Sequence, residues 1–149
     1  MTLITSISGI RGTIGGKPGE NLTPPDVVKF TAAFAAWVLG TNHGKTVVVG
    51  RDARLSGPQV AGLVNATLTS MGLDVIDLGL STTPTVEMTV VNEKAAGGII
   101  ITASHNPKQW NALKLLNHKG EFISAAEGEQ LLAAAASGNM EFAQVDALG

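Results

Sequence analysis

Apolar residues follow two alternating patterns along this chain. Short runs rich in Val, Ile and Leu are typical of buried strands, and between them apolar positions repeat every three or four residues, as on one face of a helix. The runs predict strands within residues 3–7, 46–49, 74–78, 97–102 and 113–116. The helical repeats lie within residues 23–40, 60–71, 83–91 and 124–138. This alternation predicts an α/β fold of three layers, α/β/α, around a mixed, largely parallel sheet.

Two of the predicted helices begin with a capping signal. Thr23 precedes Asp26 by three residues, with two prolines between them, and Ser124 precedes Glu127 at the same spacing. In such capping boxes the two side chains bind the free N–H groups of the first helical turn. Glycine favours helix ends, so the first helix is expected to end at Gly40.

The most informative loop follows the predicted strand at residues 97–102. Its sequence, through residue 107, is Thr-Ala-Ser-His-Asn-Pro. Small and polar residues after a buried strand reach the edge of the sheet, where loops carry chemistry, and the proline forces a turn. Ser104 is therefore expected on a short, stiff loop beside His105, with Lys108 and Lys114 close in sequence. Such residues also favour turns for backbone reasons alone, so a purely structural role stays open.

Two other polar stretches contain arginine. Residues 8–16 are rich in glycine and are expected to form a turn region. Arg11 lies within it, either as a solvated hairpin arginine or as a cation beside a ligand. Residues 50–58 place Arg51, Asp52 and Arg54 directly after a predicted strand. This spacing is typical of an ion-pair network within a loop.

A phosphate-binding P-loop is excluded at residues 40–46. That motif needs four residues between its glycines, and it must follow a strand and open a helix. Here three residues separate Gly40 from Gly44, and the segment follows a helix. His43 is therefore expected to be solvent-exposed in a helix-to-strand loop.

Composition narrows the class of protein. A length of 149 residues, 44% apolar side chains and a net charge of −2 favour one folded domain and exclude a disordered chain. The sequence has no cysteine, no block of Lys and Arg such as nonspecific nucleic-acid binding requires, and no apolar run near the roughly 20 residues that span a bilayer. The first ten residues lack the features of a signal peptide. We expect a cytoplasmic protein that binds neither nucleic acid nor membrane.

Three motifs occur in an order and at a spacing that fit one family. They are Ser8-Gly9-Ile10-Arg11-Gly12, Gly50-Arg51-Asp52-Ala53-Arg54-Leu55-Ser56 and Thr102-Ala103-Ser104-His105-Asn106-Pro107. Together they resemble the phosphohexomutases, the family of phosphoglucomutase, phosphomannomutase and phosphoglucosamine mutase. The resemblance covers the first of the family's four domains, so residues 1–149 are expected to be domain I, with domains II–IV absent from this chain.

The resemblance implies a reaction and its residues. Ser104 would carry a phosphoryl group, donate it to a hexose phosphate to form a hexose 1,6-bisphosphate, and take back the other phosphate. The implied catalytic residues are Ser104, Arg11, His105 and Lys114, the last three as orienting groups or in proton transfer, with Lys108 as a further cation. Mg²⁺ is the implied cofactor, bound by Ser104 through its phosphate. The arginines of residues 50–56 are expected to support this loop rather than to contact the substrate.

Parts of the family pattern are missing or altered. The metal loop Asp-x-Asp-x-Asp-Arg, the sugar loop and the distal phosphate loop of the family belong to later domains, and none of them occurs here. The chain is therefore expected to pack against domains II–IV of a longer enzyme and to be inactive alone. Whether the hexose is glucose, mannose or glucosamine stays open. Ala112 stands where the family usually has glycine, which costs stability if that position requires a positive φ.

Two other classes of function remain open. As a hydrolase, the chain would use Ser104 as an acyl nucleophile with a histidine base, although adjacent Ser104 and His105 side chains tend to diverge and no Gly-x-Ser-x-Gly elbow is present. As a non-catalytic binding or regulatory module, it would share only the fold of domain I.

Overall fold

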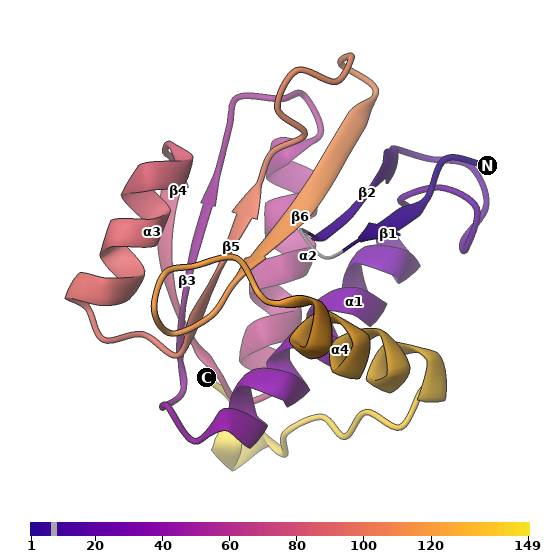
Figure 1. Cartoon of the computed structure of the whole chain (residues 1–149). Helices are drawn as coiled ribbons and strands as arrows, with labels where there is room; N and C mark the ends of the chain where they lie inside the picture. The colour runs from indigo at the N-terminus through magenta and orange to yellow at the C-terminus, as the bar shows by residue number, and fades with distance from the viewer. Residues whose placement is uncertain (7–8) are drawn as a thin grey trace.

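In the described residues, six strands form one mixed sheet between two layers of helices, and a single 3₁₀ turn lies near the C-terminus (Figure 1). The structure is a computed structural model that describes residues 1–6 and 9–149. The strands are β1 (Ile4–Ser6), β2 (Gly9–Thr13), β3 (Thr46–Arg51), β4 (Asp74–Leu80), β5 (Gly97–Ile101) and β6 (Trp110–Leu116). The helices are α1 (Pro24–Thr41), α2 (Gly57–Ser70), α3 (Thr83–Asn92) and α4 (Ala125–Ser137). The strands lie in the order β1-β2-β6-β5-β3-β4.

Strand direction changes across the sheet. β3 pairs in parallel with β4 and with β5, whereas the pairs β5–β6, β6–β2 and β2–β1 are antiparallel. The predicted three-layer α/β/α fold with a mixed sheet is confirmed, and β2, β3, β4 and β5 run in the same direction. Fewer neighbouring pairs are parallel than the sequence predicts. For β5 and β6 the reason is that only residues 102–109 join them, and a parallel pair needs a crossover of about a dozen residues or more.

Helices cover the two faces of the sheet unequally. α1, α2 and α4 pack on the face that carries Ile99, Ile101 and Leu113. On the opposite face, Val86 and Val90 of α3 pack against β3, β5 and the last residue of β6. Figure 1 shows α3 by itself on that side of the sheet. In the strand order, the rest of β6 and β2 lie beside β5 and β3, the strands that α3 covers. The candidate site lies on this part of the sheet, which α3 does not cover.

The two predicted helix starts are confirmed. At α1, the carboxylate of Asp26 accepts hydrogen bonds from the backbone N–H of Thr23, at 3.0 Å, and from its hydroxyl. At α4, the Glu127 carboxylate accepts from the Ser124 N–H at 2.7 Å, and the Ser124 hydroxyl accepts from the Glu127 N–H at 3.2 Å. These bonds satisfy N–H groups that have no partner within the helix.

The predicted end of the first helix is wrong by one residue. α1 continues past Gly40 to Thr41, and Asn42 then takes the left-handed conformation, with φ 59°. Asparagine tolerates this conformation better than most residues, so the turn does not require a glycine. Gly138, with φ 67°, ends α4 as predicted. No helix in the described part of the chain is both long and apolar enough to span a bilayer.

His43 is exposed in the loop between α1 and β3, as predicted, but it also stacks on another histidine. Its ring lies on that of His118, which follows β6, with the ring centroids 3.5 Å apart and the planes at 14°. Loss of hydration lowers the pKa of His118 below its ordinary value, and the positive charges of His43 and Lys119 lower this pKa further. The folded protein therefore favours neutral His118.

Replacing His43 should raise the pKa of His118 toward its ordinary value of about 6.5, because the substitution removes both the stacked ring and a positive charge. We expect this for His43→Asn in an NMR titration of the imidazole protons. Because the unfolded chain binds the proton more readily, wild-type stability should fall as pH decreases through about 6.5 toward the lowered pKa, and His43→Asn should reduce that loss.

Lys45→Gln provides a control for this measurement. Lys45 lies in the same loop as His43 but is not among the charges that act on His118. This variant should leave the titration of His118 in place. An unchanged His118 pKa in His43→Asn would contradict the role of the stack.

Candidate active site

The loop between β5 and β6 leaves the sheet at the carboxyl end of β5. All residues of β5 are buried, so the strand fixes where the loop begins. Two backbone hydrogen bonds then close successive turns, from the Asn106 N–H to the Ala103 carbonyl and from the Trp110 N–H to the Pro107 carbonyl, both at 3.0 Å. Ser104 lies at the exposed part of this loop. The predicted short loop with an exposed serine is confirmed.

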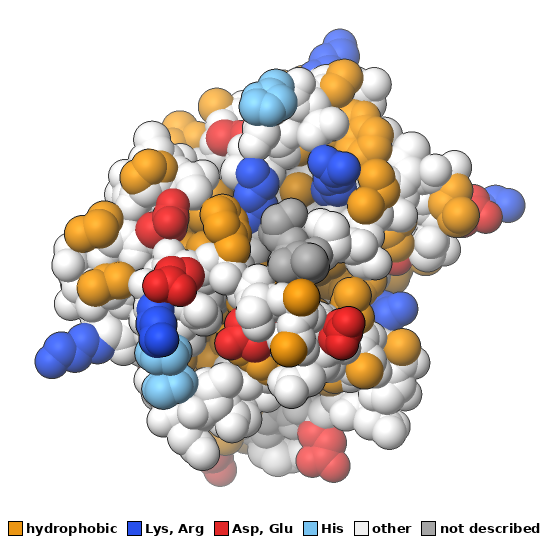
Figure 2. All heavy atoms as spheres, viewed as in Figure 1, with side chains coloured by type: hydrophobic (Ala, Val, Ile, Leu, Met, Phe, Trp, Pro, Cys, Tyr) orange, Lys and Arg blue, Asp and Glu red, His pale blue; other side chains and the backbone are white. Residues whose placement is uncertain are grey.

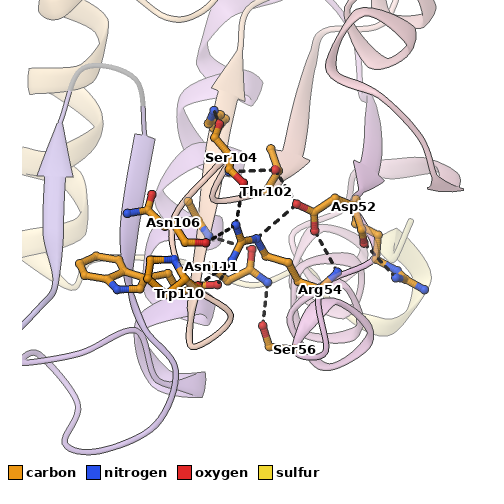
Figure 3. Close-up of polar contacts among 12 residues, drawn as sticks. Asp52, Arg54, Ser56, Thr102, Ser104, Asn106, Trp110 and Asn111 are labelled. Atoms are coloured by element: carbon orange, nitrogen blue, oxygen red, sulfur yellow. Dashed lines mark hydrogen bonds and ion pairs between the residues drawn. The ribbon is translucent and has the colours of Figure 1, made fainter.

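Ser104 has a backbone conformation that is unusual for serine. Its φ is 54°, in the left-handed region that costs an L-residue roughly 1–2 kcal/mol. Figure 3 shows the hydrogen bonds around it. The Ser104 N–H donates to Thr102 Oγ1 at 3.2 Å, and the Thr102 hydroxyl donates to Asp52 Oδ2 at 2.6 Å. These bonds tie the strained residue to the end of β3.

Arg54 binds the same loop from the other side. Its Nη1 and Nη2 atoms each donate to two backbone carbonyls, at 2.7–3.1 Å. These carbonyls belong to Ser104, Asn106, Pro107 and Trp110. The remaining donor, Nε, lies 3.3 Å from Asp52 Oδ2 (Figure 3). For Asp52 and Arg54, these contacts confirm the prediction that the segment supports the loop, whereas Arg51 binds the Asp52 carbonyl instead.

Arg11 lies in a strand, and the predicted turn region is therefore wrong for residues 9–13. These residues form β2, which pairs with β1 and β6. The glycines mislead because they serve close packing. A Cβ atom on Gly9 would lie 2.0 Å from the carbonyl oxygen of Leu113, and one on Gly12 would lie 3.0 Å from a backbone nitrogen. Ser8 of the first motif, and Ile7 of the predicted first strand, lie outside the described residues.

Lys114 contacts the serine directly. Its Nζ donates a hydrogen bond to Ser104 Oγ at 2.8 Å. Arg11 is paired with Ala112 across β2 and β6, and Lys114 lies two residues further along β6. Directly paired residues, and residues two apart in a strand, share a face of the sheet. Arg11, Ala112 and Lys114 therefore project from the same face, beside the loop that carries Ser104.

A cavity of about 290 Å³ brings these side chains together. The strands β2 and β6 form its floor, and the loop forms one wall. The lining residues are Ser6, Gly9, Ile10, Arg11, Ala103, Ser104, His105, Asn106, Ala112, Leu113 and Lys114. Figure 2 shows Lys and Arg side chains gathered on this face, beside the residues drawn in grey. The cavity thus combines a serine hydroxyl with two cations and a histidine.

The two remaining predicted residues, His105 and Lys108, differ in their position relative to the cavity. His105 lines the cavity, but the described residues include no hydrogen bond between it and the Ser104 hydroxyl, which accepts from Lys114. Lys108 is exposed and is not among the described residues that line the cavity. The four residues predicted as catalytic, Ser104, His105, Arg11 and Lys114, therefore meet at one cavity, whereas Lys108 does not join them.

Ala112 does not have the positive φ that glycine would permit. It lies within β6 and is 4% exposed, so the concern that alanine strains this position does not apply. Beside it, the amide of Asn111 donates to Ser56 Oγ at 2.8 Å and accepts from the Ala112 N–H at 2.9 Å. The fully buried Asn111 thus links β6 to the start of α2, a contact that the sequence analysis did not predict.

An exposed serine beside a lysine and an arginine, at the end of a buried strand of an α/β/α fold, defines a domain suited to an anionic ligand. Residues 3–141 match the family described as "Phosphoglucomutase/phosphomannomutase, alpha/beta/alpha domain I". The chain belongs to this family, which confirms the predicted resemblance.

Individual relatives carry corresponding names. A phosphoglucosamine mutase of Natranaerobius thermophilus is 37% identical over 131 residues, which cover 88% of this chain. A phosphoglucomutase/phosphomannomutase of Thermococcus kodakarensis is 39% identical over 112 residues, or 73% of this chain. The crystal structure of a phosphoglucomutase/phosphomannomutase family protein of Burkholderia thailandensis matches 95% of this chain with a TM-score of 0.78 at 27% identity.

This chain is much shorter than its relatives. It spans 28% of the Natranaerobius thermophilus mutase and 25% of the Thermococcus kodakarensis protein. It spans 32% of the Burkholderia thailandensis chain. The similarity therefore concerns one part of these longer proteins.

Two substitutions of Ser104 distinguish the energetic cost of its left-handed backbone from the contribution of its side-chain hydrogen bond. Ser104→Ala and Ser104→Gly both remove the hydroxyl that binds Lys114, but only glycine adopts φ 54° without steric cost. We expect Ser104→Gly to be more stable than Ser104→Ala by about 1 kcal/mol in urea unfolding.

The same pair of substitutions at Ser6 supplies the control. Ser6 lies in β1 and is not among the residues with positive φ. Glycine there should be less stable than alanine, since it has more conformational freedom to lose on folding. Equal stability of the two Ser104 variants would show that the left-handed conformation carries no cost.

Proposed function

We propose that residues 1–149 form the phosphoserine-bearing first domain of a phosphohexomutase, which interconverts hexose 1-phosphate and hexose 6-phosphate through a bisphosphorylated sugar. The observation that carries this proposal is the 2.8 Å hydrogen bond from Lys114 Nζ to Ser104 Oγ, within a cavity that Arg11 and His105 also line. Membership of the family supports it, because relatives of this chain are named as mutases of phosphorylated sugars.

The charge of the cavity suits a phosphorylated serine. Phosphoserine carries about −1.5 to −2 charges at neutral pH and needs cationic partners. Arg11 and Lys114 supply two positive charges, and no Asp or Glu is among the described residues that line the cavity. Phosphoryl transfer depends mainly on positioning and on stabilising negative charge, and this cavity offers both.

The first transfer breaks the bond between phosphorus and Ser104 Oγ and forms a bond between phosphorus and a hydroxyl oxygen of the hexose phosphate. The sugar hydroxyl loses its proton to a base, for which His105 is our candidate, and Lys114 donates a proton to Ser104 Oγ as that oxygen leaves. Arg11 orients the phosphate. The product, hexose 1,6-bisphosphate, then turns over and returns its other phosphate to Ser104 by the reverse steps.

Mg²⁺ is the proposed cofactor, held by Ser104 through an oxygen of its phosphate. Ser104 is exposed, so a phosphate on it is open to a further partner. The described residues contain no group of three or more His, Cys, Asp or Glu side chains able to hold a metal ion. We therefore propose that the remaining ligands come from a second domain. The ion supplies positive charge beside the transferred phosphoryl group.

We further propose that this domain packs against domains II–IV of a longer cytoplasmic enzyme and has no mutase activity alone. The length of the relatives supports this, since this chain spans 28% of one mutase. The choice among glucose, mannose and glucosamine phosphates would then depend on residues outside this domain.

Transfer of phosphate to Ser104 can be tested directly. The full-length protein that carries these residues should become phosphorylated at position 104 when it is incubated with hexose 1,6-bisphosphate and Mg²⁺, as measured by mass spectrometry. Ser104→Ala should lose this label, whereas Ser6→Ala, which removes another hydroxyl of the same cavity, should keep it. Lys114→Met should slow the labelling by about 10²-fold or more, because it removes the proton donor.

Other results would favour the other classes of function. Binding of a hexose phosphate without any label on Ser104 would contradict the mutase proposal and support a binding module. Labelling of Ser104 by a fluorophosphonate, but not by the bisphosphate, would contradict it in favour of a serine hydrolase.

A further inference from the structure

We propose that Arg54 is a positioning residue that sets the reactive geometry of Ser104 through the main chain. The inference rests on the proposed phosphoryl transfer at Ser104. Arg54 is not among the described residues that line the cavity, so it acts on Ser104 without touching the reacting groups.

The two terminal nitrogens of Arg54 use all their donors on backbone carbonyls. A guanidinium has five N–H groups in a fixed planar arrangement. Four of the five donate to backbone carbonyls, three in the loop and one at Trp110, the first residue of β6. In the described residues, the buried Nε makes no hydrogen bond and lies 3.3 Å from Asp52 Oδ2 as an ion pair. The Arg54 side chain is only 11% exposed. Lysine has one nitrogen with three donors, so it cannot bind carbonyls on both sides of such a fork.

The pair formed by Asp52 and Arg54 holds Ser104 on both sides. The Ser104 carbonyl accepts from Arg54 Nη2 at 2.7 Å, and the Ser104 N–H reaches Asp52 through the hydroxyl of Thr102. The pair is itself fixed, since the Arg54 N–H donates to Asp52 Oδ1 at 3.1 Å. Both peptide groups next to Ser104 are thus anchored to one short segment, and this anchoring stabilises the strained φ of 54°.

The anchored conformation directs the serine hydroxyl. A change of φ from 54° to the ordinary negative region turns the groups at Cα by roughly 110° about the N–Cα bond. Ser104 Oγ would then leave the position in which it lies 2.8 Å from Lys114 Nζ. Because phosphoryl transfer requires aligned groups, loss of Arg54 should slow the transfer. Substrate binding should persist, since Arg11 and Lys114 lie on β2 and β6 and stay in place.

Conservative substitutions distinguish positioning from simple charge. In the full-length enzyme, Arg54→Lys keeps the positive charge but loses the planar fork, and Arg54→Met loses both. We expect both variants to lower kcat by about 10²-fold, with KM changed less than about threefold. If Arg54 contributed only charge, Arg54→Lys would keep near wild-type kcat, and that result would overturn the proposal.

Arg51→Lys is the matched control. Arg51 is in the same segment, and its Nη1 donates to the Asp52 carbonyl at 3.2 Å. It binds no part of the Ser104 loop among the described contacts. The same substitution there should leave kcat unchanged. A kcat loss in Arg51→Lys as large as in Arg54→Lys would indicate general disruption of the segment and would overturn the assignment to Arg54.

A crystal structure of Arg54→Lys provides a readout that does not depend on activity. We expect residue 104 to take a negative φ, with Oγ out of reach of Lys114. Low kcat with φ still near 54° would overturn the proposal. If Arg54→Lys fails to fold, Thr102→Val tests the other anchor, because it removes the hydroxyl that links Ser104 to Asp52. It should lower kcat in the same way, and wild-type kcat in Thr102→Val would overturn the proposal.

Failure of the proposed function has a different signature. In that case wild-type protein would acquire no phosphate on Ser104, although the crystal structures would still report the effect of Arg54 on φ. Phosphorylated wild-type protein together with a fully active, folded Arg54→Lys variant would contradict the positioning role alone.

Discussion

Backbone carbonyls at the end of a buried strand need hydrogen-bond donors, and one guanidinium supplies them here. The loop after β5 turns back within a few residues, so its carbonyls converge instead of pairing in a ladder. Four of them point at Arg54 (Figure 3). Two of these hydrogen bonds are partly buried and two are exposed. Pairing four carbonyls with one side chain allows the loop to be both short and irregular. The exposed position of Ser104 follows from this arrangement.

Helix α3 covers only part of one face of the sheet, and the hydroxyl of Ser104 lies beside the uncovered part. α3 packs on β3 and β5, while β2 and β6 continue past it on the same face. The floor of the cavity is therefore formed by the sheet, and small residues in these strands leave space above it. These residues are Gly9 and Ala112, with room above for the longer side chains of Arg11 and Lys114. The strands thus place two cations beside the loop, and no Asp or Glu is among the described residues that line the cavity with them.

Local patterns in the sequence predict a large part of this structure. Continuous apolar runs indicate β3 and β5, and capping residues locate the starts of α1 and α4, because these signals involve neighbours in sequence. The motif that ends β5 also identifies the exposed loop. The strand that holds Arg11 is less accessible to such reasoning, because its glycines are explained by close neighbours distant in sequence and not by a turn. Gly9 lies against the backbone of β6, and Gly12 lies against Leu22.

Contacts between distant segments account for what the sequence does not predict. The left-handed Ser104 depends on Asp52 and Arg54, about fifty positions earlier in the chain. The approach of Lys114 to Ser104 depends on the register of β6 against β5. A list of residue types contains the ion-pair segment and the serine loop as separate features. The family resemblance indicates that they meet, but the individual contacts depend on strand order, which periodicity alone does not supply.

The hydrogen bonds from Arg54 to the loop do not depend on the side chains of the residues that accept them. Arg54 binds the oxygens of peptide groups, and every amino acid has such an oxygen, proline included. The side chains of Asn106, Pro107 and Trp110 are therefore not what the guanidinium recognises. As far as Arg54 is concerned, the loop can exchange Asn106 or the neighbouring Trp110 while the curve of its main chain is preserved, whereas Pro107 also restricts the turn itself. The main-chain conformation of this segment is thereby largely independent of the side chains on its surface. Natural variation or redesign can change side chains such as those of Asn106 and Trp110 without changing the conformation.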